Sequence, residues 1–127
     1  MHENEIAKII VDCSYKVHKE FGPGLLENVY QAALAYELTK RGLGVHTERG
    51  IPVEYDGGRL NVGFRANIVV ENKVIIECKS VDALAPIHWK ILLTYLRLSD
   101  MRLGLLINFN VELIKDGIRR VVNDLKE

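Results

Sequence analysis

The sequence predicts one α/β domain over residues 1–127, in which a mixed β-sheet is flanked by helices. The chain has 127 residues, of which 48% are hydrophobic and 27% charged, as in an ordinary globular domain with its own core. The hydrophobic spacing changes from helical to strand-like, then back to helical and again to strand-like. Tight turns pair consecutive strands antiparallel, whereas a helix between two strands brings the second back parallel. Both arrangements are therefore expected in one sheet.

The first two elements are expected to be helices. Apolar residues from Ile6 to Val17 recur at steps of three and four, which places them along one helical face. Asn4 is the expected N-cap, and the Phe-Gly-Pro-Gly sequence at residues 21–24 ends this helix. A second helix is expected over residues 25–41, just before a glycine.

The middle of the chain is predicted to form strands. Residues 56–58 (Asp-Gly-Gly) are a turn signal, and residues 71–73 (Glu-Asn-Lys) connect two longer strands. Apolar and β-branched residues dominate the segments between these turns. The expected strands cover residues 45–48, 51–55, 60–70 and 74–79.

The last third of the chain is predicted to contain a helix, a buried strand and a hairpin. The helix is expected over residues 86–99, with a proline at its first position, where proline is tolerated. Residues 103–109 (LGLLINF) are almost wholly apolar, as in a strand covered on both faces. An Asp-Gly turn then predicts a hairpin. Its strands are expected at residues 111–114 and 118–122.

Charge and cysteine content limit the possible functions. Basic and acidic residues number 17 each, so any contact with nucleic acid must rest on a local patch. Lys115, Arg119 and Arg120 form the best basic cluster, although charges that protect an edge strand explain it equally well. Two cysteines form no disulfide framework, and no apolar stretch is long enough to cross a bilayer. The first residues are acidic, unlike a secretory signal, so a cytoplasmic protein without membrane contact is expected.

Two charged residues end the strand expected over residues 74–79. Residues two apart in a strand share a face, so Glu77 and Lys79 project together. If the preceding loop has three residues, Asn67 lies opposite Glu77 on that face, with the Cβ atoms about 5 Å apart. A two-residue loop would put them on opposite faces. Taken alone, a Glu-x-Lys pair is most often a surface ion pair.

Another carboxylate, Glu27, stands in the first turn of the second expected helix. Glu27 and Tyr30 are three residues apart and share a helical face. The helix dipole favours an anion at this end, which is by itself a sufficient structural reason for Glu27. A functional interpretation therefore depends on Glu27 meeting Glu77 and Lys79.

These residues match a known pattern. Residues 24–30 read G-x-x-E-x-x-Y within the segment VHKEFGPGLLENVYQAAL, and FRANIVVE, VIIECK and LGLLINF follow. Over about residues 11–122 the chain resembles the bacterial and archaeal GxxExxY family, a branch of the PD-(D/E)xK nuclease superfamily. The resemblance implies a restriction-endonuclease-like core with the order α-α-β-β-β-α-β and a C-terminal β-hairpin. This order agrees with the elements predicted above.

The resemblance also implies roles for individual residues. In such nucleases a helix Glu, a strand Asp and a strand Glu bind Mg²⁺ or Mn²⁺ together with a backbone carbonyl, and a Lys stands beside the attacking water. Matched position by position, Glu27, Glu77 and Lys79 are the catalytic candidates. The candidate metal ligands are Glu27, Asn67, Glu77 and the backbone carbonyl of Cys78.

Two positions depart from the family pattern and predict a weakened site. Asn67 stands where the family usually has Asp; it keeps a carbonyl oxygen that can bind a metal but lacks the negative charge. Ile91 stands where the family often has Gln on the following helix, which removes a polar group beside the substrate. We therefore expect weak binding of Mg²⁺ or Mn²⁺ and slow or absent hydrolysis.

Four further residues are candidates for substrate contact, each with a structural alternative. Tyr30 and Tyr95 would mainly pack in the core, with hydroxyls that reach the cleft. Arg65 would meet a phosphate or form a salt bridge to one of the glutamates. His88 lies near the start of the third helix, where capping or a solvent-facing position is the more common role.

Two functions from different classes follow. The first is a Mg²⁺-dependent phosphodiester hydrolase, a nuclease acting on DNA, which Glu27, Glu77 and Lys79 favour. The second is a non-catalytic module on the same fold that binds nucleic acid or a protein, which Asn67 and Ile91 favour. An apolar edge near LGLLINF or in the last hairpin would also allow a homodimer.

Overall fold

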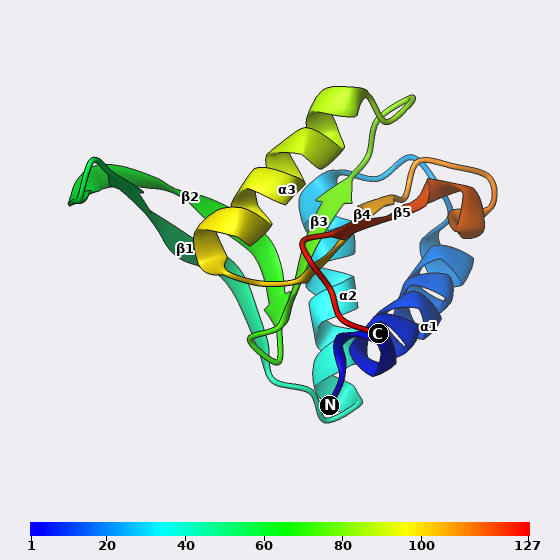
Figure 1. The fold of residues 1–127 in the computed structure, drawn as a ribbon. Helices are drawn as coiled ribbons and strands as arrows, with labels where there is room; N and C mark the ends of the chain where they lie inside the picture. Colours follow the sequence, from blue (N-terminus) through cyan, green and yellow to red (C-terminus); the bar gives the residue numbers. More distant parts are fainter.

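The computed structural model describes residues 1–127, and its strands form one five-stranded sheet. Two helices, three strands, a third helix and two further strands follow one another along the chain (Figure 1). The elements are α1 (Glu3–Phe21), α2 (Glu27–Lys40), β1 (Val45–Tyr55), β2 (Gly58–Val70), β3 (Val74–Lys79), α3 (Pro86–Ser99), β4 (Leu103–Asn108), a 3₁₀-helix (Ile114–Gly117) and β5 (Ile118–Val122).

The sheet is mixed, as predicted. Its strand order is β1-β2-β3-β4-β5; β3 and β4 are parallel, and the other neighbouring pairs are antiparallel. Helix α3 makes the crossover between the two parallel strands. Val70 pairs with Val74, so the loop between β2 and β3 has three residues, and Glu71 and Asn72 adopt left-handed φ angles of 54°. This is the register that puts residues 67 and 77 opposite each other.

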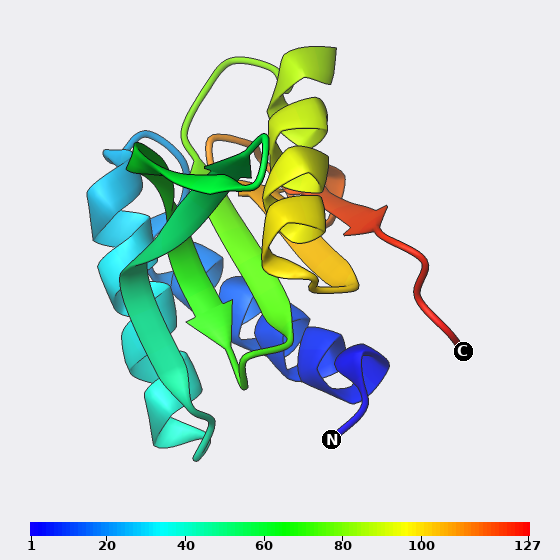
Figure 2. The same cartoon turned by 60° about the vertical axis from the view of Figure 1, so that its left-hand side comes forward.

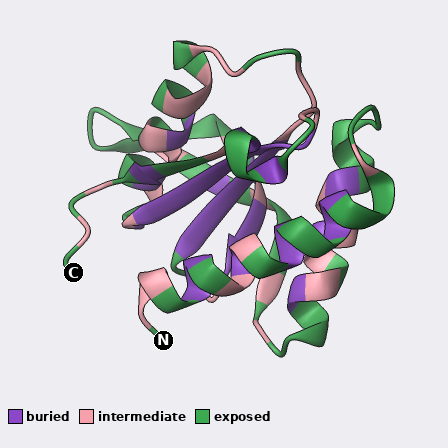
Figure 3. Ribbon diagram, turned by 90° about the vertical axis from the view of Figure 1, so that its right-hand side faces the viewer, coloured by how far each residue is buried: buried purple, intermediate pink, exposed green.

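Helices cover both faces of the sheet. The larger apolar core lies between the sheet and helices α1 and α2, where Ile10, Leu34 and Ile76 are fully buried (Figure 3). The smaller core lies under α3, where Leu92 and Leu96 are fully buried. Each such side chain stabilises the fold by about 1.5–3 kcal/mol. Both ends of β3 are therefore held between two packed layers.

The first part of the sheet differs from the prediction in one respect. Residues 45–48 and 51–55 are not separate strands; β1 is continuous, and Arg49 and Gly50 pair with Ala66 and Arg65. The apparent break in the sequence corresponds to Glu48, which has a φ of 50° and no pairing partner in the ladder. One strand with a local irregularity therefore replaces the two short strands.

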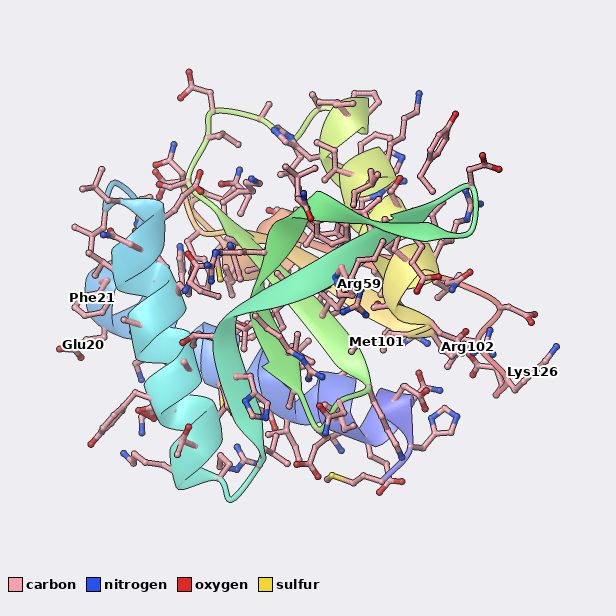
Figure 4. All side chains as sticks on the ribbon, turned by 90° about the vertical axis from the view of Figure 1, so that its left-hand side faces the viewer. Glu20, Phe21, Arg59, Met101, Arg102 and Lys126 are labelled. Atoms are coloured by element: carbon pink, nitrogen blue, oxygen red, sulfur yellow. The ribbon has the colours of Figure 1, made fainter.

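The end of β1 and the start of β2 form an arm that leaves the body of the molecule (Figure 1). Its turn is Asp56-Gly57, with φ angles of 53° and 78°, as a two-residue type I′ hairpin requires. Figure 4 shows Arg59 on this arm, whereas Glu20 and Phe21 lie beyond α2. At the base of the arm Phe64 stacks on Tyr95 of α3, with ring centroids 3.9 Å apart.

The C-terminal hairpin is present, but its first strand is not the predicted one. Residues 111–114 form no strand, and the Asp-Gly sequence lies in the 3₁₀-helix instead. β5 pairs antiparallel with β4, and every residue of Leu103–Asn108 is buried. β4 therefore has no free edge for the suggested homodimer contact; the edges of the sheet are β1 and β5.

The two chain ends lie together (Figure 1). His2, not Asn4, caps α1: its Nδ1 accepts a hydrogen bond from the Asn4 amide, and Glu5 completes a capping box. The Nε2 atom of His2 lies 2.8 Å from the Lys126 carbonyl oxygen, which ties the C-terminal segment to this helix. None of the helices combines the length and the apolar run that crossing a bilayer requires.

Candidate functional site

The candidate site forms where β2 and β3 stop pairing. The last ladder pair is Ile68 with Ile76, and side chains then replace the missing backbone bonds. The Asn67 amide donates a hydrogen bond to Oε2 of Glu77 (2.7 Å), and the Cys78 amide donates to Oδ1 of Asn67 (2.9 Å). The predicted juxtaposition of Asn67 and Glu77 is therefore confirmed.

The Asn67 side chain is already engaged at the strand end. An amide N–H needs an acceptor, so the Asn67 atom that receives the Cys78 N–H is Oδ1. One of the two lone pairs of the expected ligand oxygen is therefore occupied within the fold, and the NH₂ group binds no cation. An aspartate in the same rotamer would keep the bond to Cys78 and present a second, negatively charged oxygen.

Glu77 is a buried carboxylate with one oxygen left over. Its side chain is 7% exposed, and only Oε2 has a hydrogen-bond partner, so Oε1 keeps its contact with solvent. Burial raises the pKa of Glu77 to about 7, against the Asn67 hydrogen bond and the Lys79 charge, which lower it; the charges of Glu48 and Glu27 raise it further. The group would be stabilised by a nearby cation.

Lys79 lies on the same strand two residues further and is half-buried. No carboxylate lies within 4.0 Å of its ammonium, so the predicted surface ion pair with Glu77 is not formed. Its charge nevertheless lowers the pKa of Glu77 after burial has raised it, so the two groups interact at longer range. Lys79 therefore retains its donors for a ligand.

Cys78 offers its backbone carbonyl to the site, whereas its thiol is buried away from it. Its side chain is fully buried in the core beneath α1 and α2, and burial raises the pKa of its thiol. The next carbonyl, that of Lys79, accepts from Phe109 on the β4 side (2.9 Å). Successive carbonyls of a strand alternate, so the Cys78 carbonyl points toward β2, where the ladder has ended.

Glu27 is brought to this end of the sheet by the loop between α1 and α2. Figure 2 shows α2 and α3 beginning at the end of the molecule where β3 finishes. The Ser80 hydroxyl donates to the Leu25 carbonyl (2.6 Å), which joins this loop to β3. Glu27 itself is exposed and lines a shallow pocket of about 400 Å³ together with Ser80.

Tyr30 packs beneath this loop, and its hydroxyl is engaged within the protein. It is fully buried and stacks on Phe109, with ring centroids 4.5 Å apart. Its hydroxyl donates to the Gly22 carbonyl (2.5 Å) and accepts from the Leu25 amide (3.1 Å). Both polar functions are satisfied within the protein, so Tyr30 acts as the brace that places Glu27.

The remaining candidates lie toward α3 and the arm. Nδ1 of His88 accepts from the Ala85 amide (2.9 Å), so His88 caps the start of α3. Burial raises the pKa of the half-buried Tyr95 hydroxyl, and the charge of Glu77 raises it further. Arg65 forms no salt bridge to a glutamate; Nη1 donates to the carbonyl of Glu48 (3.0 Å). Ile91, in place of the family's glutamine, is exposed on α3.

The basic cluster at the C-terminal hairpin is largely engaged within the fold. The Arg119 guanidinium lies over the Trp89 ring, 3.7 Å from its centroid, in a cation–π contact. Arg120 lies 3.5 Å from the Glu127 carboxylate. The cluster therefore offers little free positive charge to nucleic acid.

Two residues near the site were not singled out in the sequence. Asn108, 2% exposed, bonds both backbone groups of Val81 and so fixes the loop after Lys79. The signal in the sequence that could have identified Asn108 is its position as a polar residue at the end of an apolar strand. Glu48 acts electrostatically on Glu77 from β1, and only the strand register reveals it.

The donors suit a hydrated, hard cation, not a closed metal cage. No three His, Cys, Asp or Glu side chains come close enough to hold an ion together. The available groups are the Glu77 Oε1, the Cys78 carbonyl and the Glu27 carboxylate, all of them oxygens. Mg²⁺ and Mn²⁺ accept such ligands, and Mg²⁺ keeps several waters when only one or two carboxylates bind it.

Comparison with protein families agrees with this geometry. The family model of the PD-(D/E)XK nuclease superfamily matches residues 4–121, which is nearly the whole chain. No curated protein and no solved structure gives a significant match. Nucleases of this superfamily generally use divalent metal ions and act on nucleic acid. With its mixed sheet, flanking helices and open strand end, the chain belongs to the PD-(D/E)XK nuclease superfamily.

Proposed function

We propose that the protein is a divalent-metal-dependent phosphodiester hydrolase acting on DNA, with a site weakened by Asn67. One observation carries the proposal: a buried carboxylate, Glu77, has one oxygen without a hydrogen-bond partner where β2 and β3 stop pairing, and Lys79, two residues further on the same strand, has no carboxylate within 4.0 Å of its ammonium. A charge pair kept apart in a half-buried setting destabilises a fold, so a purely structural role accounts for it poorly.

The cation would be held by Glu77, the Cys78 carbonyl and Glu27, with water completing its coordination. When bound, a divalent cation polarises the phosphodiester and makes a water more acidic. Glu77 orients the ligand through Oε1 while Oε2 remains on the Asn67 amide. Lys79 donates to the attacking water or to a phosphate oxygen, and its charge stabilises the negative charge that develops.

The balance of charge near the site argues for a cation. The charges of Glu48 and Glu27 raise the pKa of Glu77 and only that of Lys79 lowers it, so negative charge exceeds positive charge around this carboxyl. A bare phosphate diester would be repelled there, whereas a bound divalent ion reverses the sign. The same excess of negative charge predicts modest affinity for DNA in the absence of metal.

The arm offers a route for the substrate strand. A shallow, open depression of about 510 Å³, formed by residues 50–52 and 59–65, carries Arg59 and Arg65. Arg65 connects this concavity to the site through its bond to Glu48. Guanidinium groups bind phosphates in bidentate fashion, so we assign these two arginines to the DNA backbone. Binding should then weaken with salt.

The test compares the protein with its Asn67→Asp variant on supercoiled, linear, branched and single-stranded DNA, with Mg²⁺, Mn²⁺ or chelator. We expect metal-dependent cleavage by the variant at a rate at least about tenfold above that of the unchanged protein, since a full ligand set is restored. The matched control, Asn67→Asp combined with Glu77→Gln, should be inactive. Cleavage that persists in chelator or in this control would refute the proposal.

A non-catalytic DNA-binding module is the second candidate. The observation that favours it is the Asn67 side chain, which carries no negative charge and whose Oδ1 already accepts the Cys78 N–H. In that case neither protein cleaves, but both retard DNA in a gel, and Arg59→Ala with Arg65→Ala abolishes the retardation. Absence of both cleavage and retardation would rule out a role on DNA altogether.

A further inference from the structure

The arm that projects from the sheet (Figure 1) carries a bulge in β2. The register of its two strands shifts between Pro52 and Glu54, so that residues 60–62 (Leu-Asn-Val) stand against a single β1 residue, Val53. Such a bulge bends the strand and turns its side chains out of the regular ladder. The leucine and the valine of the bulge are 41% and 70% exposed, and the asparagine between them is exposed as well. The bulge therefore presents two apolar side chains and one amide to solvent.

An arginine stands on each side of the bulge. Arg59 precedes it and Arg65 follows it, and both line the shallow depression of the arm. Their ladder partners on β1 are Glu54 and Gly50, and this separation corresponds to about 13 Å along a strand. The major groove of duplex DNA is about 12 Å wide, with a phosphate backbone along either side. The two arginines are therefore spaced to contact phosphates on both sides of one groove.

The residues between the arginines suit the floor of such a groove. There the base pairs expose hydrogen-bond donors and acceptors, which amide side chains bind, and thymine exposes a methyl group, which apolar side chains contact. The groove also admits a two-stranded β-ribbon, which is the form of the arm. Within residues 50–65 the charged side chains are Glu54, Asp56 and the two arginines. Because these charges balance, affinity for DNA has to come from groove contacts in addition to the phosphate contacts.

The aromatic rings around the site are already engaged within the fold. Phe64 and Tyr95 stack on each other, with an angle of 8° between their planes, and a guanidinium covers the Trp89 ring. Tyr30 is fully buried, and the exposed ring of the arm, Tyr55, lies beside its turn. Proteins that hold single strands stack successive bases on free aromatic rings. The arrangement here favours a substrate whose bases stay stacked on one another.

We propose that the substrate is double-stranded DNA and that the arm enters its major groove. Arg59 and Arg65 contact phosphates on the two sides of the groove, and the bulge at residues 60–62 contacts the base edges between them. The inference rests on the function proposed above and specifies the form of its DNA substrate. The arm serves binding and positioning, whereas the candidate metal ligands lie where β2 and β3 stop pairing.

Fluorescence anisotropy tests the inference without relying on activity. The probes are a labelled DNA duplex and one of its two strands alone, labelled in the same way, at low salt and in chelator. We expect the dissociation constant for the duplex to be at least about tenfold lower than that for the single strand. Single-strand binding that is equal or tighter would overturn the inference.

The dependence of binding on salt separates groove contacts from phosphate contacts. Val62→Ser should raise the dissociation constant for the duplex at least about threefold and leave its salt dependence unchanged, because no charge is lost. Arg59→Gln should also weaken binding, and the slope of log affinity against log salt should become smaller by about one. Leu113→Ser, the same kind of change at an exposed position beside the 3₁₀-helix, is the matched control and should change neither quantity. Urea unfolding checks that all variants are folded.

Two further outcomes would overturn the role of the arm. One is that Val62→Ser binds the duplex as Leu113→Ser does. The other is that Val62→Ser converts a dimer into a monomer in light scattering, because the arm would then serve a second copy of the chain.

The failure of this inference can be told apart from failure of the proposed function. If Asn67→Asp cleaves single-stranded DNA with Mn²⁺ but neither binds nor cleaves the duplex, the hydrolase stands and the inference falls. If the duplex binds through the arm and neither protein cleaves it with Mn²⁺, the role of the arm stands and the hydrolase falls. If neither form of DNA is bound or cleaved, with or without metal, both fail.

Discussion

Replacing Glu77 with glutamine should make the protein more stable at alkaline pH. Glu77→Gln retains the shape of the side chain and an oxygen that accepts the Asn67 N–H, but it never ionises. The native carboxyl has a pKa of about 7, raised chiefly by burial, against an ordinary value of 4.5. Ionisation is therefore easier in the unfolded chain than in the native protein.

The sign and size follow from linkage. Below pH 4.5 the carboxyl is protonated in both states and exerts no penalty. Between pH 4.5 and 7 the unfolded chain loses its proton first, so the free energy of unfolding falls as pH rises. The difference of about 2.5 pKa units corresponds to roughly 3 kcal/mol, fully developed above pH 7. Glu77→Gln should therefore gain about 3 kcal/mol over the unchanged protein between pH 4 and pH 8.5.

Urea unfolding in chelator, followed by the fluorescence of the single tryptophan, Trp89, measures this difference at each pH. Glu54→Gln, an exposed carboxylate on β1, is the matched control and should show no comparable change. If the stability difference between Glu77→Gln and the unchanged protein stayed flat from pH 4 to 8.5, the carboxyl would not be buried and isolated as described. A difference that shrank with rising pH would reverse the sign of the reasoning.

Three further changes probe the support of the site, all by urea unfolding in chelator. Tyr30→Phe removes the hydroxyl bonds to Gly22 and Leu25 and should lower the free energy of unfolding by about 1–3 kcal/mol. Proteolysis at residues 22–26 should become faster, and unchanged proteolysis would contradict the supporting role of Tyr30. Asn108→Ala leaves buried backbone groups of the following loop unpaired and should cost about 2–3 kcal/mol; a loss below about 0.5 kcal/mol would show that the loop stands without it. Glu48→Gly suits the left-handed φ and removes a charge that raises the pKa of Glu77, so it should raise stability by about 1 kcal/mol; a loss of stability would mean that the Glu48 side chain serves the fold.

The element order and the central register were predictable because they depend on local signals. The predicted bounds of α3 and β3 agree with the structure at every end residue. Pro86 marked the start of α3, and the apolar run before Glu77 marked β3. The three-residue loop with Asn72 in a left-handed conformation sets the register of β2 against β3. The C-terminal hairpin was misplaced because a local turn signal, Asp-Gly, competes with a long-range pairing, and the pairing buries more apolar surface.

The sequence predicted which residues gather at the site, but not how their side chains are oriented. The adjacency of Asn67 and Glu77 follows from strand alternation, and Glu27 and Lys79 follow from their motifs. The orientation of the Asn67 amide was not predictable, because it depends on a backbone N–H that is free only where the ladder ends. Glu48 was missed because two separate strands, 45–48 and 51–55, were predicted in place of β1. That prediction did not give the register of β1 against β2, in which position 48 lies opposite position 67.

The Asn67 amide lowers the electrostatic repulsion within this site before an ion binds. An aspartate there would place a second negative charge about 5 Å from Glu77, a repulsion of roughly 1–3 kcal/mol at intermediate dielectric. Asparagine keeps the bond that seals the strand end at Cys78 and avoids that repulsion. Stability without metal and affinity for metal therefore oppose each other at this one position.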